Sequence, residues 1–177
     1  MNHCHPDIPI LKTPRLRLEP LSLKHSDGMF KMWRNPLVQR FSGDVEDEFQ
    51  TAIPMPAKTQ GDSDRLIGFW LNAAIDGWGF RWAIIRIDGK TFLGHIGFNS
   101  LLECSEIAYH MNPDFWGNGF MYEAATAAIE WRRDNGGLAI EAFIEPENKL
   151  SIALALRLGM NETDAYVDNA RRYQMPI

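Results

Sequence analysis

The fold is decided by the stretch Ile107-Ala-Tyr-His-Met-Asn-Pro-Asp-Phe-Trp-Gly-Asn-Gly-Phe-Met-Tyr-Glu-Ala-Ala-Thr-Ala-Ala-Ile-Glu-Trp131. Its pattern predicts a short alternating strand, an aromatic and proline-containing corner, a Gly-x-Gly turn and an alanine-rich helix. A helix that begins at a glycine turn presents unpaired backbone N–H groups and the positive end of its dipole. The stretch therefore predicts an anion site, for which a phosphate group is the natural ligand.

The segment after this stretch predicts a crossover. The helix should run from Gly119 to about Asn135 and end at Gly136-Gly137, and residues 138–145 form a strand that Pro146 cuts off. Because strand–helix–strand connections are usually right-handed, this strand should lie parallel to the one that ends near Met111. The anion site would then lie where the carboxyl ends of the strands open.

The segment before the stretch predicts an antiparallel meander. Residues 80–87 and 91–99 alternate as strands joined by Asp88-Gly89, a strong hairpin signal, and residues 105–111 form a third strand. Gly94 and Gly97 in the second strand mark a bulge or a close approach of two backbones.

The remaining elements complete one domain. We expect a first strand at Leu16-Arg-Leu-Glu19, at a sheet edge because Pro14 and Pro20 flank it. Helical spacing and caps predict three further helices, at residues 24–34, 62–74 and 149–158. Weak alternation in residues 160–177 predicts a terminal hairpin.

Residues 41–62 form a polar, irregular segment with the acidic run Asp44-Val-Glu-Asp-Glu48. A solvated loop explains each of these carboxylates, whereas a long loop beside an active site often recognises substrate. Both interpretations stay open.

The composition is that of an ordinary soluble domain. A chain of 177 residues, 45% hydrophobic and 23% charged, suits one core and no linker. The net charge of −5 argues against nucleic-acid binding and favours cationic or amine substrates. With two cysteines, no apolar run of membrane-spanning length and no signal peptide, we expect a cytoplasmic protein without a membrane partner.

Residues 1–10 are interpreted as a flexible tail. His3, Cys4 and His5 are metal-ligand types, but three adjacent ligands without a fourth make a poor site, so we expect no metal.

Four motifs carry a family resemblance. They are Thr13-Pro-Arg-Leu-Arg-Leu18, Gly77-Trp-Gly-Phe-Arg-Trp-Ala83, Trp116-Gly-Asn-Gly-Phe-Met121 and Asn148-x-x-Ser151 continuing to Arg157-x-Gly159-Met160. With the element order, they make nearly the whole chain similar to the GNAT acetyltransferase family, in particular to its ribosomal-protein alanine acetyltransferase branch (RimJ and RimL). A dinucleotide fold fits less well, since Tyr122 stands where its third glycine belongs and no acidic residue ends a suitable strand.

The resemblance implies an α/β (α+β) fold. It would contain a mixed, mostly antiparallel sheet of six to seven strands, flanked by four helices and splayed between the fourth and fifth strands. The strands ending at Met111 and starting at Leu138 would separate after Met111, leaving backbone groups for an extended ligand. By resemblance, the backbone of Tyr109, His110 and Met111 would pair with a pantetheine arm and hold its thioester carbonyl.

The resemblance also implies acetyl-CoA as cosubstrate. Its pyrophosphate would be held by the backbone of one turn, made of Trp116, Gly117, Asn118, Gly119, Phe120 and Met121. Tryptophan at the first position is familiar in this branch. Methionine at the last is a departure, and its bulk would shift or weaken coenzyme binding.

Two further residues match the family at the start of the last helix, Asn148 and Ser151. Most of the family has a tyrosine four residues after the serine to protonate the leaving thiolate, but here that position is Ala155. Ser151 is then the candidate acid; its alternative role is a hydrogen bond at the helix start.

Acetyl transfer to an amine also needs a base, because the acceptor ammonium group must lose a proton. Glu106 is the first candidate, since the family often has glutamate at the matching place, although a solvent-facing strand glutamate would look the same. His110 lies on the same face and its pKa would suit a base, but it can equally be a packed residue. Glu123, in the first turn of the helix, would only complement the helix dipole.

The sequence thus supports three hypotheses. The first is an acetyl-CoA-dependent N-acetyltransferase that transfers directly to a primary amine, either a protein N-terminus or a small molecule, and acts as a monomer or homodimer. The second is a CoA-binding module with little or no catalysis, motivated by Met121 and Ala155. The third is a protein that binds no CoA.

Overall fold

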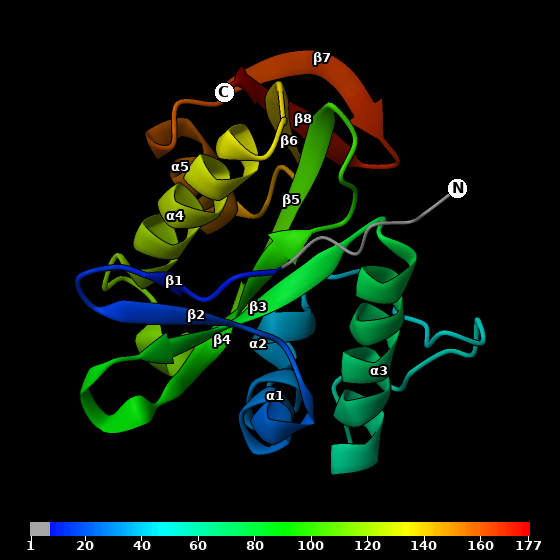
Figure 1. The fold of residues 1–177 in the computed structure, drawn as a ribbon. Helices are drawn as coiled ribbons and strands as arrows, with labels where there is room; N and C mark the ends of the chain where they lie inside the picture. Colours follow the sequence, from blue (N-terminus) through cyan, green and yellow to red (C-terminus); the bar gives the residue numbers. More distant parts are fainter. Residues whose placement is uncertain (1–7) are drawn as a thin grey trace.

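A computed structural model describes residues 8–177, which build one mixed sheet with helices on both faces (Figure 1). The strands are β1 Leu11–Lys12, β2 Leu16–Pro20, β3 Phe80–Arg86, β4 Phe92–Phe98, β5 Cys104–Met111, β6 Ala139–Ile144, β7 Asn161–Val167 and β8 Ala170–Pro176. The helices are α1 Ser26–Trp33, α2 Pro36–Gln39, α3 Gln60–Asp76, α4 Phe120–Asp134 and α5 Lys149–Arg157.

The sheet has the order β1-β2-β3-β4-β5-β6-β8-β7 and is antiparallel except for the pair β5 and β6. This confirms the predicted fold class and the parallel crossover. The sheet has eight strands, one more than the six to seven predicted, because the chain turns back at Pro14 and pairs β1 with β2. β2 is therefore not an edge strand, contrary to our expectation. The two prolines are tolerated because Pro14 lies in the turn and Pro20 at the end of the strand.

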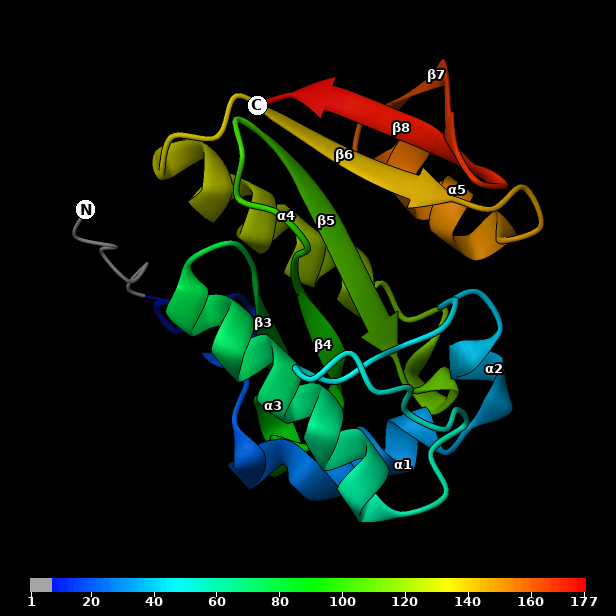
Figure 2. The same cartoon turned by 90° about the vertical axis from the view of Figure 1, so that its right-hand side faces the viewer.

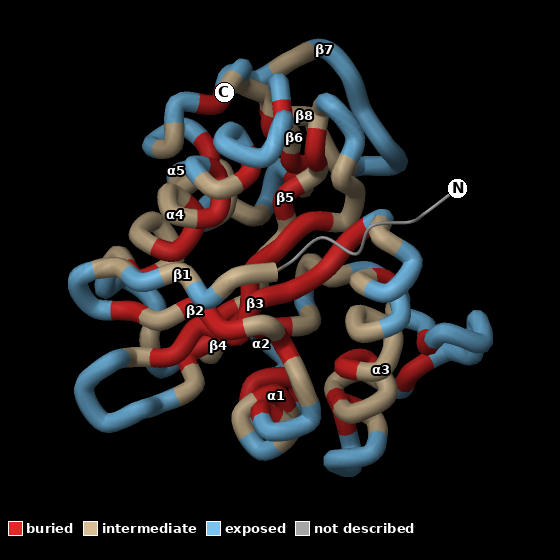
Figure 3. Tube along the Cα trace, viewed as in Figure 1, coloured by how far each residue is buried: buried red, intermediate tan, exposed pale blue. Residues whose placement is uncertain are grey.

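Each face of the sheet packs against one hydrophobic cluster. The helices that cover the two faces are seen in Figure 1, and the buried stretches of the chain in Figure 3. α4 and α5 cover one face, where Ala124, Ala125 and Ala128 are completely buried and let α4 approach the strands closely. α1 and α3 cover the other face, around the buried side chains of Met29 and Ile67.

Glycines in β4 permit a close approach of three strands. A Cβ atom on Gly94 would lie 2.2 Å from the carbonyl oxygen of His110 in β5, and one on Gly97 would lie 2.0 Å from that of Phe80 in β3. The predicted close backbone approach is confirmed, and a bulge between Ile84 and Ile85 accompanies it.

The helices differ from the prediction at two places. Pro36 ends α1 as expected, but it also opens the short helix α2 with Asn35 as its cap, so five helices flank the sheet instead of four. α3 begins earlier than predicted because Thr59 and Asp62 form a capping box in front of it.

Residues 8–10 contact the folded domain, although we expected residues 1–10 to be a flexible tail. Ile8 packs against the core, and the indole of Trp82 donates a hydrogen bond of 2.8 Å to the carbonyl of Pro9. The remaining tail residues, which include His3, Cys4 and His5, lie outside the described residues.

The sheet opens between β5 and β6, which Figure 2 shows diverging along their length. Their ladder joins only residues 104–106 to residues 139–141, after which β5 stays with β4 and β6 stays with β8. The splay predicted between these strands is present, but it begins after Glu106 and not after Met111. Tyr109, His110 and Met111 therefore all lie in the open part of β5.

Candidate active site

The opening leads into a cavity of about 800 Å³. It is lined by residues from both faces of β5, Glu106 and His110 on one side and Tyr109 and Met111 on the other. The start of α4 and the start of α5 bound it on one face of the sheet, and residues 37–42 bound it on the other. The cavity thus passes through the sheet. A smaller cavity of about 370 Å³ adjoins it at Glu106 and reaches the turn between β7 and β8.

Backbone groups of β5 face this opening in alternation. The N–H of Asn112 donates to β4 at 2.9 Å, and His110 faces β4 in the same register. The residues that alternate with them, Tyr109 and Met111, direct their backbone groups into the opening. The prediction that the backbone of His110 pairs with a ligand arm is therefore wrong, because that backbone already belongs to the β4 ladder.

The turn before α4 is held by its own side chains. The indole Nε1 of Trp116 donates to the carbonyl of Met111 at 2.8 Å, which fixes the turn to the end of β5. The side-chain amide of Asn118 donates to the carbonyls of Phe115 and Trp116 at 3.1 and 3.0 Å. Asn118 thus shapes the turn from within.

Left-handed backbone at two glycines lets this turn end in a helix. Gly117 and Gly119 have φ values of +75° and +74°, and Gly119 is the cap of α4. The next N–H groups have no partner inside the helix and border the cavity at Phe120 and Met121. The side chain of Met121, the departure from the family pattern, packs partly against the core under α4.

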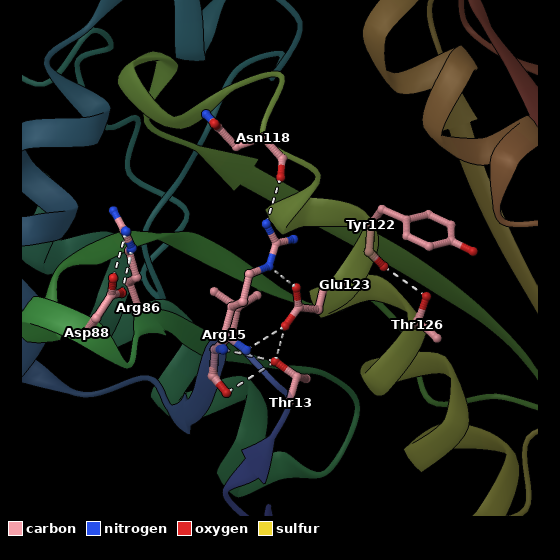
Figure 4. Close-up of polar contacts among 9 residues, drawn as sticks. Thr13, Arg15, Arg86, Asp88, Asn118, Tyr122, Glu123 and Thr126 are labelled. Carbon is pink, nitrogen blue, oxygen red and sulfur yellow. Dashed lines mark hydrogen bonds and ion pairs between the residues drawn. The ribbon is translucent and has the colours of Figure 1, made fainter.

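Glu123, in the first turn of α4, does more than complement the helix dipole (Figure 4). Its carboxylate accepts hydrogen bonds from the hydroxyl of Thr13 at 2.5 Å and from the backbone and side chain of Arg15 at 2.9 and 2.6 Å. Burial would raise the pKa of Glu123, but these bonds and the charge of Arg15 hold it below its usual value.

Glu106 lies where the large and small cavities meet. The amide of Asn99 donates to its carboxylate at 2.6 Å, and the guanidinium of the buried Arg81 donates to the other end of that amide. Burial raises the pKa of Glu106, and the Asn99 hydrogen bond and the Arg81 charge oppose this only in part. A carboxylate with a raised pKa is a stronger base than an ordinary one.

His110 has a structural role. The Ser42 hydroxyl donates to the carbonyl of Val38 at 3.0 Å, so the His110 Nε2–H, 2.9 Å from the Ser42 oxygen, must be the donor of that pair. Burial lowers the pKa of His110 to about 3, with a smaller contribution from Arg81. Its imidazole is therefore neutral at physiological pH and fastens the segment after α2 to β5.

Asn148 and Ser151 are brought together at the start of α5. The Asn148 side chain caps the helix by accepting from the Ser151 N–H at 3.2 Å. The phenol of Tyr109 lies beside the Ser151 side chain. Burial raises the pKa of Tyr109 and the Ser151 side chain lowers it by less, so the phenol stays protonated. Ala155, at the family's tyrosine position, is a buried core residue.

The residues that sequence reasoning missed act through contacts that only the folded chain makes. Asn99, just after β4, donates to Glu106 and accepts from Arg81 in β3, and the phenol of Tyr109 lies beside Ser151 of α5. The sequence signal for such contacts is weak. The motif that contains Thr13 and Arg15 supported the family resemblance, but the sequence predicted no role for either residue in the site.

These features define a class of protein: an open mixed sheet with a glycine turn at a helix start beside it. Residues 15–161 match the family described as the acetyltransferase (GNAT) domain, so the chain belongs to the GNAT family and is an N-acetyltransferase by that membership.

Individual relatives agree with this assignment. The chain is similar to the uncharacterized N-acetyltransferase YoaA of Bacillus subtilis, with 29% identity over 87% of this chain and 84% of the relative. Two solved structures are similar in fold. RimL, a ribosomal L7/L12 alpha-N-protein acetyltransferase in complex with coenzyme A, has a TM-score of 0.76 and 15% identity, covering 96% of this chain and 98% of RimL. The microcin C7 self-immunity acetyltransferase MccE, in complex with acetyl-CoA and AMP, has a TM-score of 0.74 and 18% identity, and the match covers 93% of this chain and 94% of MccE.

Two further observations concern the part of the chain that the structure describes. Within residues 8–177, no helix is both long and apolar enough to cross a membrane. In the same residues, no three His, Cys, Asp or Glu side chains are grouped as metal ligands.

Proposed function

We propose that the protein transfers the acetyl group of acetyl-CoA directly to a primary amine, with both substrates bound at once. The single observation that carries this proposal is the cavity that passes through the sheet. The glycine turn and Ser151 line it from the side of α4 and α5, whereas Glu106 and residues 37–42 line it from the opposite side. Coenzyme and acceptor can therefore approach one point on β5 from different faces.

The residues present fit acetyl-CoA. The backbone of Tyr109 and the N–H of Met111, which face the opening, suit the extended pantetheine arm, which carries amide groups of its own. The turn at Gly119 and the start of α4 suit the pyrophosphate. Both line the same cavity as Asn148 and Ser151 at α5.

The chemistry needs one base and one acid. Glu106, acting directly or through water, takes the proton from the acceptor ammonium group, and the freed amine nitrogen forms a bond to the thioester carbonyl carbon. The carbon–sulfur bond breaks, and the leaving thiolate takes the hydroxyl proton of Ser151. The nitrogen still carries one proton more than the amide needs and gives it to solvent, and a solvent proton restores the Ser151 hydroxyl, directly or by way of the neighbouring phenol of Tyr109. No covalent acetyl-enzyme is required.

The acceptor is proposed at the level of a primary amine, either a protein N-terminus or a small-molecule amine. The likeness in fold to RimL supports the first and the likeness to MccE keeps the second open. A cytoplasmic protein, monomeric or homodimeric, remains our expectation.

An assay of CoA release tests the proposal. Wild-type protein is supplied with acetyl-CoA and with panels of N-terminal peptides, polyamines, amino acids and aminoglycosides, and binding of acetyl-CoA is followed in parallel by thermal shift. A ligand at 100 times its Kd should stabilise the protein by about 2.7 kcal/mol. Binding with amine-dependent release supports the enzyme. Binding without release would leave only a coenzyme-binding module, and no thermal shift would contradict both.

A further inference from the structure

The motif Thr13-Pro-Arg-Leu-Arg-Leu18 has no role in the mechanism above, yet its first residues contact the coenzyme turn (Figure 4). The guanidinium of Arg15 divides its donors between two partners. Its Nε donates to the Glu123 carboxylate at 2.6 Å, and its Nη1 donates to the carbonyl oxygen of Asn118 at 3.0 Å. Arg15 thereby joins the connection between β1 and β2 to the turn that precedes α4.

The contact with Asn118 fixes the direction of one backbone donor. In a planar trans peptide, the C=O of one residue and the N–H of the next point in opposite directions. Because the Asn118 carbonyl is held toward Arg15, the N–H of Gly119 must point away from Arg15. Gly119 borders the cavity, so this N–H is presented to an anion there.

The contact with Glu123 removes an unfavourable charge. A bare carboxylate in the first turn of α4 would repel an anion at the same helix terminus. Glu123 instead receives the Arg15 guanidinium, the Arg15 backbone N–H and the Thr13 hydroxyl. The Arg15 guanidinium also lies 4.5 Å from the ring of Phe120, the first residue of the helix, which keeps it beside the turn.

We propose that Arg15 is a positioning residue for the coenzyme: it orients the Asn118–Gly119 peptide and neutralises Glu123, so that the turn binds a pyrophosphate. This inference rests on the proposed coenzyme site. Arg15 acts through the turn and does not touch the reacting atoms. Its loss should therefore weaken coenzyme binding without slowing the chemical step.

Arg86 provides a matched control. Its guanidinium lies 5.8 Å from the same Phe120 ring, but it pairs with Asp88 in its own hairpin and forms no hydrogen bond with the turn (Figure 4). Arg86→Ala removes the same charge from the same neighbourhood. A general loss of positive potential would affect both variants alike, whereas loss of positioning would affect Arg15→Ala alone.

The experiment measures the Kd of CoA by calorimetry and kcat and KM for acetyl-CoA, on wild type, Arg15→Ala, Arg15→Lys and Arg86→Ala, with the melting temperature of each. For Arg15→Ala we expect a rise of about tenfold in Kd and KM at unchanged kcat, since a charged hydrogen bond is lost. Arg15→Lys keeps the charge, but an ammonium group lacks the planar fork that reaches both partners. Its Kd for CoA should therefore lie between those of wild type and Arg15→Ala.

Two results would overturn the inference. One is a Kd for Arg15→Ala equal to that of Arg86→Ala; the other is a loss of kcat with unchanged KM. If Arg15→Ala fails to fold, the Kd, kcat and KM of Arg15→Lys are compared with those of Arg86→Ala by the same two criteria. Wild-type protein that binds no CoA would contradict the proposed coenzyme site itself, and that outcome is distinct because it needs no variant.

Discussion

The two sides of the cavity are built in different ways. On the coenzyme side, the turn takes its shape mainly from contacts between near neighbours in the chain, such as Trp116 with Met111 and Asn118 with Phe115, and the distant Arg15 then holds the finished turn. On the acceptor side, residues 37–42 line the cavity, and the segment that follows them, residues 43–62, is held by contacts with distant segments. Asp47 accepts two hydrogen bonds from Arg65, at 2.9 and 2.7 Å, and Ser42 meets His110 in β5.

This difference separates the part of the site that a short stretch of sequence builds from the part that depends on the whole fold. Local backbone geometry at glycines makes a phosphate-binding turn in any chain that carries the pattern. Long-range side-chain contacts depend on the whole fold, and a few substitutions can change them while the turn stays intact. We therefore expect variants on one side to affect coenzyme binding and variants on the other to affect the acceptor.

The largest effect should come from Glu106, which lies where the two sides meet. Glu106→Gln removes the base but keeps the size of the side chain, so the rate of acetyl transfer should fall by about 100-fold or more while the Kd of acetyl-CoA stays unchanged. CoA release at saturating substrates measures the rate of acetyl transfer, and calorimetry measures the Kd of acetyl-CoA. Glu103→Gln, an exposed glutamate just before β5, is the control. A Glu106→Gln rate equal to that of the control would assign the base elsewhere.

A smaller effect is expected at the coenzyme turn. Gly119→Ala places a side chain at a φ of +74°, so either the turn shifts or the protein loses stability, and the Kd of acetyl-CoA should rise by about tenfold. Gly136→Ala, at the other end of α4, has a φ of +84° and open space for a Cβ atom, so it carries a similar backbone cost away from the turn. Equal Kd values for the two variants would show that the turn does not bind the coenzyme.

On the acceptor side, Asp47→Asn tests the loop. The substitution weakens the contact with Arg65, and the KM for the acceptor should rise by about fivefold at an unchanged Kd for acetyl-CoA. Asp44→Asn changes an exposed residue of the same acidic run and should leave both quantities unaltered. If Asp47→Asn changed the Kd of acetyl-CoA and not the acceptor KM, the separation of the two sides would be wrong.

The smallest effect is a shift in pH dependence. Asn99→Ala removes a hydrogen bond that lowers the pKa of Glu106 and breaks the link to Arg81, so the pKa of Glu106 should rise further. Glu106 works as a base only when ionised. The acidic limb of the pH–rate profile should therefore move to higher pH, while the plateau above it is kept. A limb that stays in place, or moves to lower pH, would contradict the role of Asn99.

The part of the site that the sequence predicted is the local part. The glycine turn, the helix after it and the parallel strand were all readable, because periodicity and glycine placement act over a few residues. The opening of the sheet was predicted from resemblance, but its start at Glu106 depends on where the β5 and β6 ladder stops. The predicted role of the His110 backbone does not hold because strand pairing decides which backbone groups are free, and no local pattern gives that pairing.

The rest of the site could not be predicted because it consists of side chains that meet across the fold. Nothing local indicates that Arg81 reaches Asn99 in the neighbouring strand, or that Thr13 reaches Glu123. Two weaker predictions failed for the same reason. The predicted edge position of β2 is wrong because β1 pairs with β2, and the tail predicted to include residues 8–10 is held there by the bond from Trp82 to Pro9.

Hydrogen exchange at the open part of β5 tests the central claim most directly. The amides of Tyr109, His110 and Met111 would be followed one by one by NMR, with and without CoA. Tyr109 and Met111, which face the opening, should exchange rapidly in the free protein and become protected when CoA binds, whereas His110, paired with β4, should be protected in both states. Bound CoA that leaves the exchange of Tyr109 and Met111 unchanged would show that the coenzyme does not occupy the opening between β5 and β6.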